Sequence, residues 1–171
     1  LDKKIVSSKI QETSGSITFS LDDKYIFYSK LDDNHRPKKI FRHEIGAPVK
    51  NDVLIFEELN ERFTTSIGMT SDEKYFIIGS GDHTTSEVYY FPTHDNNPKP
   101  RLFKKAKEGI IYSINSWNND FYIHTNDEAE DFRICKCKHN KINAWEDVVP
   151  AKDEVLVGGF IMLNNWMIRS E

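Results

Sequence analysis

Short runs of hydrophobic and aromatic residues, each bounded by Asp, Asn, Gly or Pro, recur along the chain. The clearest pair is SLDDKYIFYSK at 20–30 and TSDEKYFIIGS at 70–80, in which an Asp, a Lys and a Tyr occupy the same places. Weaker copies of the hydrophobic run occur at 119–125 and 164–170. Self-similarity with a period of about 45–50 residues is typical of solenoids and propellers. The pattern therefore predicts a chain built from copies of one unit.

Each period contains up to four such runs, and their β-branched and aromatic residues indicate β-strands. The second strand of each unit is the repeated hydrophobic run, and a tight Asp- or Asn-bearing turn joins it to the first strand, as in a hairpin. The other strands are expected at 16–19, 65–69, 111–114 and 157–161 (first), at 39–43, 87–91 and 132–137 (third), and at 52–56, 101–103 and 146–149 (fourth). No stretch sustains the apolar spacing of a long amphipathic helix. The prediction is an all-β fold.

Four antiparallel strands per period make a blade of a β-propeller, with the innermost strand small-sided near the channel. Gly68, Gly158 and Gly159 fall in that expected strand. We expect one partial propeller domain over 1–171, made of the last strand of a preceding blade at 1–9, blades at 14–57, 63–104 and 109–150, and the first hairpin of a further blade at 155–171. This is about 3.5 blades, fewer than a closed ring requires. The alternative is a β-sandwich.

Composition narrows the classes of function. The chain is 38% hydrophobic and 29% charged, as in ordinary globular proteins. Its net charge of −4, with scattered Lys and Arg, gives no basic stripe for nucleic acid. Its apolar runs fall far short of the roughly 20 residues of a membrane-spanning helix. Two cysteines, close together in sequence, do not make the disulfide framework of a secreted domain, so we expect a cytoplasmic protein.

Several longer strings carry a resemblance to a known family. They are DNHRP at 33–37, FRHEIG at 41–46, DVLIFEE at 52–58, NERF at 60–63, GDHTTSEV at 81–88, and TN at 125–126 with DFR at 131–133. In this order and spacing they resemble the N-terminal propeller of the prolyl oligopeptidase family of serine peptidases, most closely its oligopeptidase B (protease II) branch. The resemblance runs from about residue 14 to residue 169, essentially the whole chain.

The resemblance implies a seven-bladed propeller that caps a C-terminal α/β-hydrolase domain with a Ser-Asp-His triad, in an enzyme that cleaves short peptides after Arg or Lys. This chain would be the non-catalytic, substrate-gating part, inactive alone. Its partners would be that hydrolase domain and short basic peptides, with no cofactor. A second hypothesis is a stand-alone propeller that binds protein partners. A third, a module for carbohydrate or nucleotide, has no residue constellation behind it.

The residues themselves predict no catalytic, cofactor or metal site. No G-x-S-x-G elbow is present, and the nearest strings, at 79–81 and 66–68, lack its spacing. Asp82, His83 and Ser86 belong to one loop, where capping is expected rather than a triad. Cys135, Cys137 and His139 alternate along one strand, nearly 7 Å apart, which suits buried thiols better than tetrahedral zinc. The glycines at 79 and 81 match no nucleotide-binding fingerprint.

The loops that join second to third strands, at 31–38, 81–86 and 126–131, hold much of the polar chemistry. Because their positions in the unit are equivalent, we expect them on one face, with an excess of acidic side chains. The candidate site is an acidic rim that steers cationic peptides. Its residues are Asp127, Glu128, Glu130 and Asp131. The simpler interpretation is that these loops are hydrophilic because they are solvated.

Overall fold

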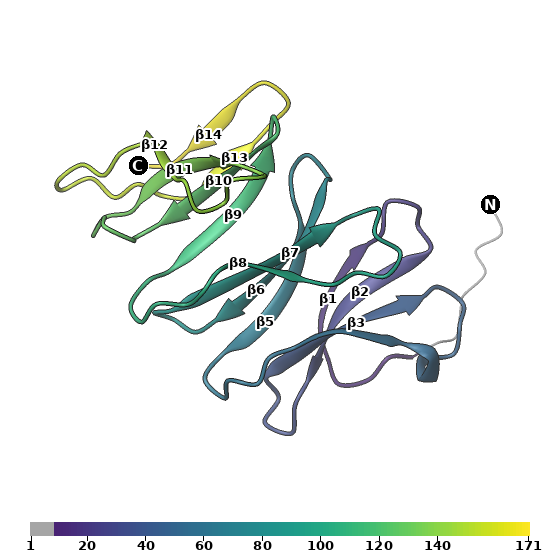
Figure 1. The fold of residues 1–171 in the computed structure, drawn as a ribbon. Coiled ribbons are helices and arrows are strands. Elements are labelled where there is room, and N and C mark those ends of the chain that lie inside the picture. The colour runs from purple at the N-terminus through teal and green to yellow at the C-terminus, as the bar shows by residue number, and fades with distance from the viewer. Residues whose placement is uncertain (1–8) are drawn as a thin grey trace. The chain divides into compact units, whose positions relative to one another are not determined.

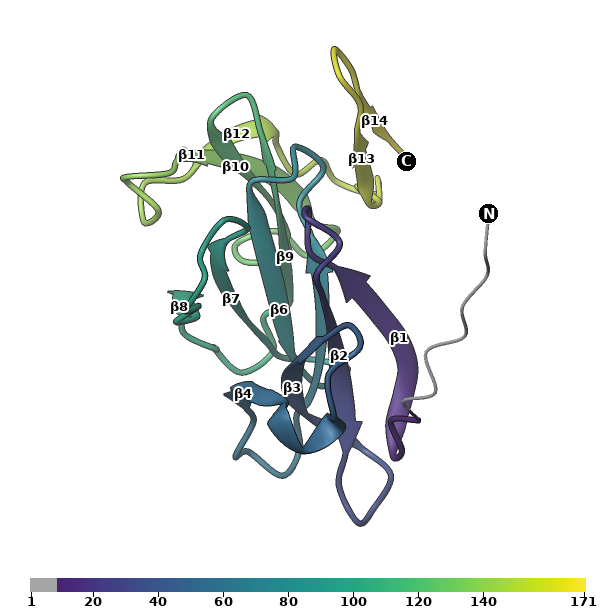
Figure 2. The ribbon, with the colours of Figure 1, turned by 90° about the vertical axis from the view of Figure 1, so that its right-hand side faces the viewer.

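The computed structural model describes residues 9–171, whose regular structure is fourteen β-strands and one turn of 3-10 helix (Figures 1 and 2). The all-β fold is confirmed. The strand expected at 1–9 lies outside the described residues, except for Lys9. The chain divides into two compact units, one that ends at Ile67 and one from Gly68 to Glu171.

The first unit contains a four-stranded antiparallel sheet in the order β1-β2-β3-β4. Its elements are β1 (Thr13–Phe19), β2 (Tyr25–Leu31), β3 (Pro37–Glu44), η1 (Val49–Asn51) and β4 (Val53–Glu57). Contacts of one carboxylate fix its last strand. Asp52 accepts one from the Tyr28 hydroxyl at 2.8 Å and lies 2.6 Å from Nδ1 of His43. The start of β4 is therefore held against β2 and β3.

Two further four-stranded sheets and a hairpin follow, in the orders β5-β6-β7-β8, β9-β10-β11-β12 and β13-β14. Their strands are β5 (Thr64–Met69), β6 (Tyr75–Gly81), β7 (Ser86–Pro92), β8 (Arg101–Lys104), β9 (Tyr112–Trp117), β10 (Asp120–Thr125), β11 (Arg133–Lys138), β12 (Glu146–Val149), β13 (Phe160–Met162) and β14 (Met167–Arg169). Each sheet is a meander of strands in chain order, as the propeller prediction requires.

One expected strand begins late. The prediction placed a strand at 157–161, whereas β13 begins at Phe160, so Gly158 and Gly159 precede it. The Gly158 N–H donates to the Ser170 carbonyl at 2.9 Å, and a Cβ on Gly158 would lie 2.1 Å from the Ser170 hydroxyl. This glycine therefore permits a close approach to the end of the same hairpin.

The repeated sequence string is a hydrogen-bonded turn. In the first copy Ser20 donates to Asp22 at 2.7 Å and accepts from the Tyr25 N–H at 2.9 Å. In the second, Thr70 donates to Asp72 at 2.9 Å and accepts from the Tyr75 N–H at 3.1 Å. The hydroxyl and carboxylate thus replace the backbone partners that a tight turn leaves unpaired.

The core of the second unit lies between its two large sheets. The fully buried ring of Phe121 on β10 lies 5.1 Å from that of Tyr75, 5.2 Å from that of Tyr90 and 5.3 Å from that of Phe103, between ring centroids. A smaller cluster joins the third sheet to the β13–β14 hairpin and consists of Tyr122, Ile134, Val157 and Met162. Burial of these side chains fixes successive sheets against each other.

Candidate functional site

The loops of the second unit that were expected to share a face meet at the connection between β8 and β9. The Gly109 N–H donates to the Thr85 hydroxyl at 3.1 Å, and the Gly109 carbonyl accepts from the Asn126 carboxamide at 2.9 Å. The 81–86 and 126–131 loops are thus joined through one residue. The third predicted loop, 31–38, belongs to the first unit.

Asp82 in the first of these loops acts as a cap. Its Oδ1 accepts hydrogen bonds from the N–H groups of Thr84 and Thr85 at 2.9 and 3.0 Å. Ser86 donates instead to the Tyr112 carbonyl at 3.0 Å. The expectation of capping within this loop is confirmed. In the first unit Asp32 has the same role and pairs with Arg36 at 2.9 Å.

Asp127, the first residue of the expected acidic rim, is buried and paired with two cations. Its carboxylate lies 2.8 Å from Lys104 Nζ and 3.3 Å from Lys107 Nζ. The hydrogen bond from Lys104 and the charge of Lys107 hold the pKa of Asp127 below its usual value despite burial. Lys104 also lies 4.0 Å above the ring of Trp145. Asp127 therefore offers little charge to a ligand.

The remaining rim residues divide into two places. Glu128 is exposed and lies 3.4 Å from Arg133. Glu130 and Asp131 instead line a groove of about 320 Å³, which we call the acidic groove. Its other lining residues are Ala151, Lys152, Asp153 and Glu154. The lining thus contains four acidic residues and one lysine.

Two hydrogen bonds hold the acidic groove together. The Val157 N–H donates to the Asp131 carbonyl at 2.8 Å, and the Val157 carbonyl accepts from Nε2 of His124 at 2.7 Å. They place the 151–154 segment, which precedes β13, beside the loop between β10 and β11. The sequence prediction missed Asp153 and Glu154, although a propeller brings the connection between blades to the same face as this loop.

A second polar cluster contains the residue types of a hydrolytic triad. Ser116 Oγ donates to Asp72 Oδ2 at 2.8 Å and lies 3.0 Å from His139 Nε2. The arrangement is not catalytic, since the carboxylate contacts the serine rather than the imidazole, and Ser116 is fully buried. His139 Nδ1 lies 3.2 Å from the hydroxyl of Tyr75. The cluster links the second and third sheets.

The alternating Cys135, Cys137 and His139 do not converge. Both thiols are buried in the core, as expected, and Cys135 donates to Asp147 at 3.2 Å. Within residues 9–171 no group of three or more His, Cys, Asp or Glu side chains is arranged to hold a metal ion. In the same part of the chain, no helix is long and apolar enough to cross a membrane.

Proteins of known name are similar in sequence to most of this chain. Protease 2 of Moraxella lacunata is 31% identical over 157 residues, which are 85% of this chain and 23% of that protein. Dipeptidyl aminopeptidase BI of Pseudoxanthomonas mexicana is 23% identical over 172 residues, or 98% of this chain and 24% of the relative. The chain therefore spans about a quarter of the length of these relatives.

Solved structures share the fold. Oligopeptidase B from Trypanosoma brucei, with covalently bound antipain, superposes with a TM-score of 0.91 at 22% identity over 96% of this chain and 24% of its own. Oligopeptidase B from Leishmania major gives 0.92 at 21% identity over 98% and 24%. The family profile described as prolyl oligopeptidase, N-terminal beta-propeller domain, matches residues 1–171. The chain belongs to the prolyl oligopeptidase family, within its N-terminal β-propeller domain.

Proposed function

We propose that this chain is the substrate-gating, non-catalytic part of an oligopeptidase B-like serine peptidase that cleaves short peptides after Arg or Lys. The observation that carries the proposal is the match of the propeller family to the whole chain, in a region that is about a quarter of relatives named as peptidases. A C-terminal α/β-hydrolase domain in the same protein would supply the catalytic serine.

The packing of the second unit supports a gating role. Its sheets are joined through fully buried aromatic residues and through the cluster of Ser116, His139 and Asp72. Sheets held in this way move as one body, so substrate would enter by movement of the propeller against the hydrolase domain rather than by opening of one loop. Such a gate admits short peptides and excludes folded proteins.

The acidic groove supports the preference for basic peptides. Glu130, Asp131, Asp153 and Glu154 give it an excess of negative charge near Lys152. Because long-range attraction raises the local concentration of an oppositely charged substrate, the groove would steer peptides that carry Arg or Lys. In this proposal the residues of the acidic groove, and not Asp127, attract the peptide. The charge of Asp127 is balanced by Lys104 and Lys107.

The test uses the longer protein that the proposal requires. We expect it to hydrolyse a short Arg amide and to leave a folded protein of the same composition uncut. The double substitution Glu130→Gln/Asp153→Asn should lower kcat/KM for the Arg peptide about threefold at low ionic strength, with a smaller loss at high salt.

The matched control removes the same charge elsewhere in the second unit, by Glu73→Gln/Asp95→Asn, and should leave kcat/KM unchanged. Equal effects of the two double substitutions would show that net charge alone matters and would remove the steering hypothesis. Absence of any cleavage of Arg or Lys peptides would overturn the proposed function as a whole.

A further inference from the structure

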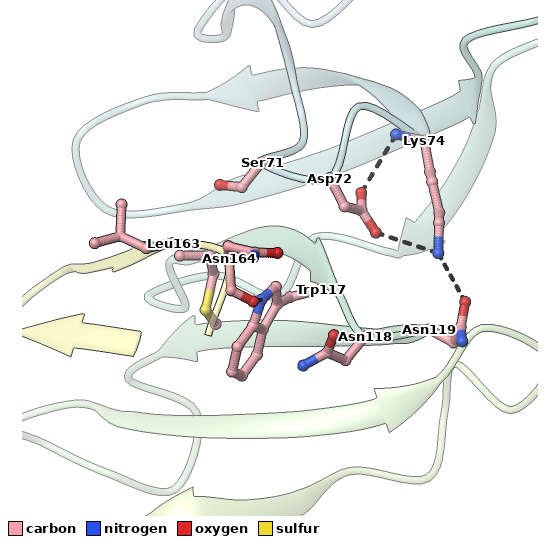
Figure 3. A pocket seen from close by; sticks show the side chains of 9 residues that line it. Ser71, Asp72, Lys74, Trp117, Asn118, Asn119, Leu163 and Asn164 are labelled. Atoms are coloured by element: carbon pink, nitrogen blue, oxygen red, sulfur yellow. Dashed lines mark hydrogen bonds and ion pairs between the residues drawn. The ribbon is translucent and has the colours of Figure 1, made fainter. Parts of the chain in front are cut away.

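We propose that the hairpin turns of the second unit form a binding site for an uncharged, extended stretch of peptide main chain. The turns are those between β5 and β6, β9 and β10, and β13 and β14, and they enclose a groove of about 370 Å³ (Figure 3). We call it the turn groove. It is lined by Asp72 and Lys74, by Trp117, Asn118 and Asn119, and by Asn164, among others. Its volume is within the range of small-ligand sites, about 300–1,000 Å³.

The charged groups in the turn groove are already engaged. Asp72 accepts hydrogen bonds from Thr70 at 2.9 Å and from Ser116 at 2.8 Å. Lys74 Nζ lies 3.6 Å from that carboxylate and donates to the side-chain oxygen Oδ1 of Asn119 at 2.7 Å, as Figure 3 shows. The groove therefore presents no unpaired charge, which favours a neutral ligand over a phosphate or a basic side chain.

Carboxamides supply the free hydrogen-bonding groups. Within the described residues, the side chains of Asn118 and Asn164 have no hydrogen-bond partner, and Asn119 keeps its NH₂ group. A carboxamide offers a donor and an acceptor in the geometry of a peptide bond, so it can pair with the N–H and C=O of one extended residue. The unpaired donors and acceptors of the turn groove thus match those of a peptide main chain.

Trp117 provides the apolar side of the site. Its indole lies between the side chains of Asn164 and Asn118 in Figure 3. The ring packs against Tyr122, with 5.7 Å between centroids, and its Nε1–H donates to the Asn164 carbonyl at 3.3 Å. An indole fixed on one edge leaves a rigid apolar ledge for the aliphatic part of a peptide side chain, at little cost in conformational entropy.

A saccharide would also use an aromatic ledge and carboxamides. A carboxylate that accepts from hydroxyl groups would strengthen that alternative, yet among residues 9–171 the only carboxylate lining this groove, Asp72, already accepts from Thr70 and Ser116. Peptide main chain needs no such acceptor, because each residue supplies one donor and one acceptor. The contacts therefore favour peptide.

The test is a titration of the full ¹⁵N-labelled chain with N-acetyl-trialanine methylamide, followed by NMR. We expect saturable shifts of the Trp117 indole N–H, identified by its loss in Trp117→Phe, and of the Asn118 and Asn164 side-chain NH₂ groups. Asn164→Ala and Asn118→Gly should each weaken binding about tenfold, because each removes a paired donor and acceptor. Glycine is chosen at position 118, where φ is 50°, to keep the turn.

The matched control is Asn143→Ala, an exposed asparagine in the turn between β11 and β12, which should bind the peptide normally. Saturable shifts with maltotriose but not with the peptide would overturn the proposal, as would unchanged affinity in both turn-groove variants or no saturable shift. The inference is independent of the proposed function. The probe contains no Arg or Lys, so its binding can fail while Arg peptides are cleaved, or succeed while they are not.

Discussion

His139 Nε2 donates a hydrogen bond to Ser116 Oγ, 3.0 Å away. The direction follows from proton count. The serine hydroxyl has one proton and gives it to Asp72, which as a carboxylate can only accept, so the imidazole must supply the proton between itself and the serine. In the neutral ring Nδ1 then accepts from the Tyr75 hydroxyl at 3.2 Å. The chain of hydrogen bonds runs from Tyr75 to Asp72 and joins β6 and the turn before it to β9.

Ser116→Ala should destabilise the protein. The change leaves the half-buried imidazole N–H without its acceptor and removes one donor from Asp72, at a cost of about 1–3 kcal/mol in the free energy of unfolding. Urea denaturation measures this value. Ser113→Ala, on the same strand but exposed, is the control and should change the free energy by less than about 0.5 kcal/mol. Equal effects of the two would contradict the assigned network.

Stability should fall in mild acid because of His139. Burial lowers the pKa of His139 from its usual value of 6.5, while the Asp120 carbonyl and the Asp72 carboxylate oppose that shift and Lys74 adds to it. The unfolded chain therefore takes up a proton first, so the contribution is complete above pH 6.5 and is lost as pH falls from there toward the folded pKa. The free energy of unfolding measured between pH 7.5 and 5 should show this slope.

The variant for that measurement is His139→Gln, which has no titrating ring. Its stability should depend less on pH over the same interval than that of the natural chain, whatever the other histidines contribute. An identical pH slope in both proteins would show that His139 does not titrate differently on folding.

Tyr112→Phe should be among the more costly single-atom deletions. The Tyr112 hydroxyl donates to the Lys104 carbonyl and accepts from the N–H groups of Val88 at 3.0 Å and Lys104 at 3.2 Å. Loss of this hydroxyl leaves buried backbone groups unpaired, which should lower the free energy of unfolding by about 1–3 kcal/mol. Tyr122→Phe is the control, because no described residue hydrogen-bonds the Tyr122 hydroxyl. Thermal and urea unfolding should rank the two variants in this order.

The thiols should react slowly in the native state. Burial raises the pKa of Cys135 to about 12 and that of Cys137 to about 11. At pH 8 both are therefore protonated and inaccessible, so a disulfide reagent should modify neither until the chain unfolds. Ser113→Cys adds an exposed thiol on β9. This variant should react at once and release one equivalent of the reagent's chromophore. A fast phase in the natural chain would contradict the described burial.

Strand positions were predictable because they depend on local patterns. Runs of β-branched and aromatic residues indicated the strands, the turn string with Asp22 or Asp72 identified the first two hairpins, and β12 occupies the expected 146–149. The start of β13 was not predictable. Gly158 lies beside Ser170 because the two ends of the hairpin pack together. A local sequence pattern carries no information on such a contact.

The polar contacts that define the site were mostly beyond sequence reasoning. Asp127 was expected to be part of an open acidic rim, yet its pairing with Lys104 joins the loop after β10 to the end of β8, which belongs to another sheet. The same holds for Ser116 and Asp72, which are separated by 44 positions. Local hydrogen bonding, such as the capping by Asp82, was predictable from sequence. The pairing of charges was not, because it depends on how the sheets pack.

Gly109 donates to Thr85 through its N–H and accepts from Asn126 through its carbonyl, so the polar ends of adjacent sheets are mechanically coupled through the backbone of a single residue. A displacement that a bound molecule imposes on one of these loops would therefore strain the other loop as well as the sheets beneath. Neighbouring repeats in this protein would then respond to contact as a pair, although each has its own set of strands.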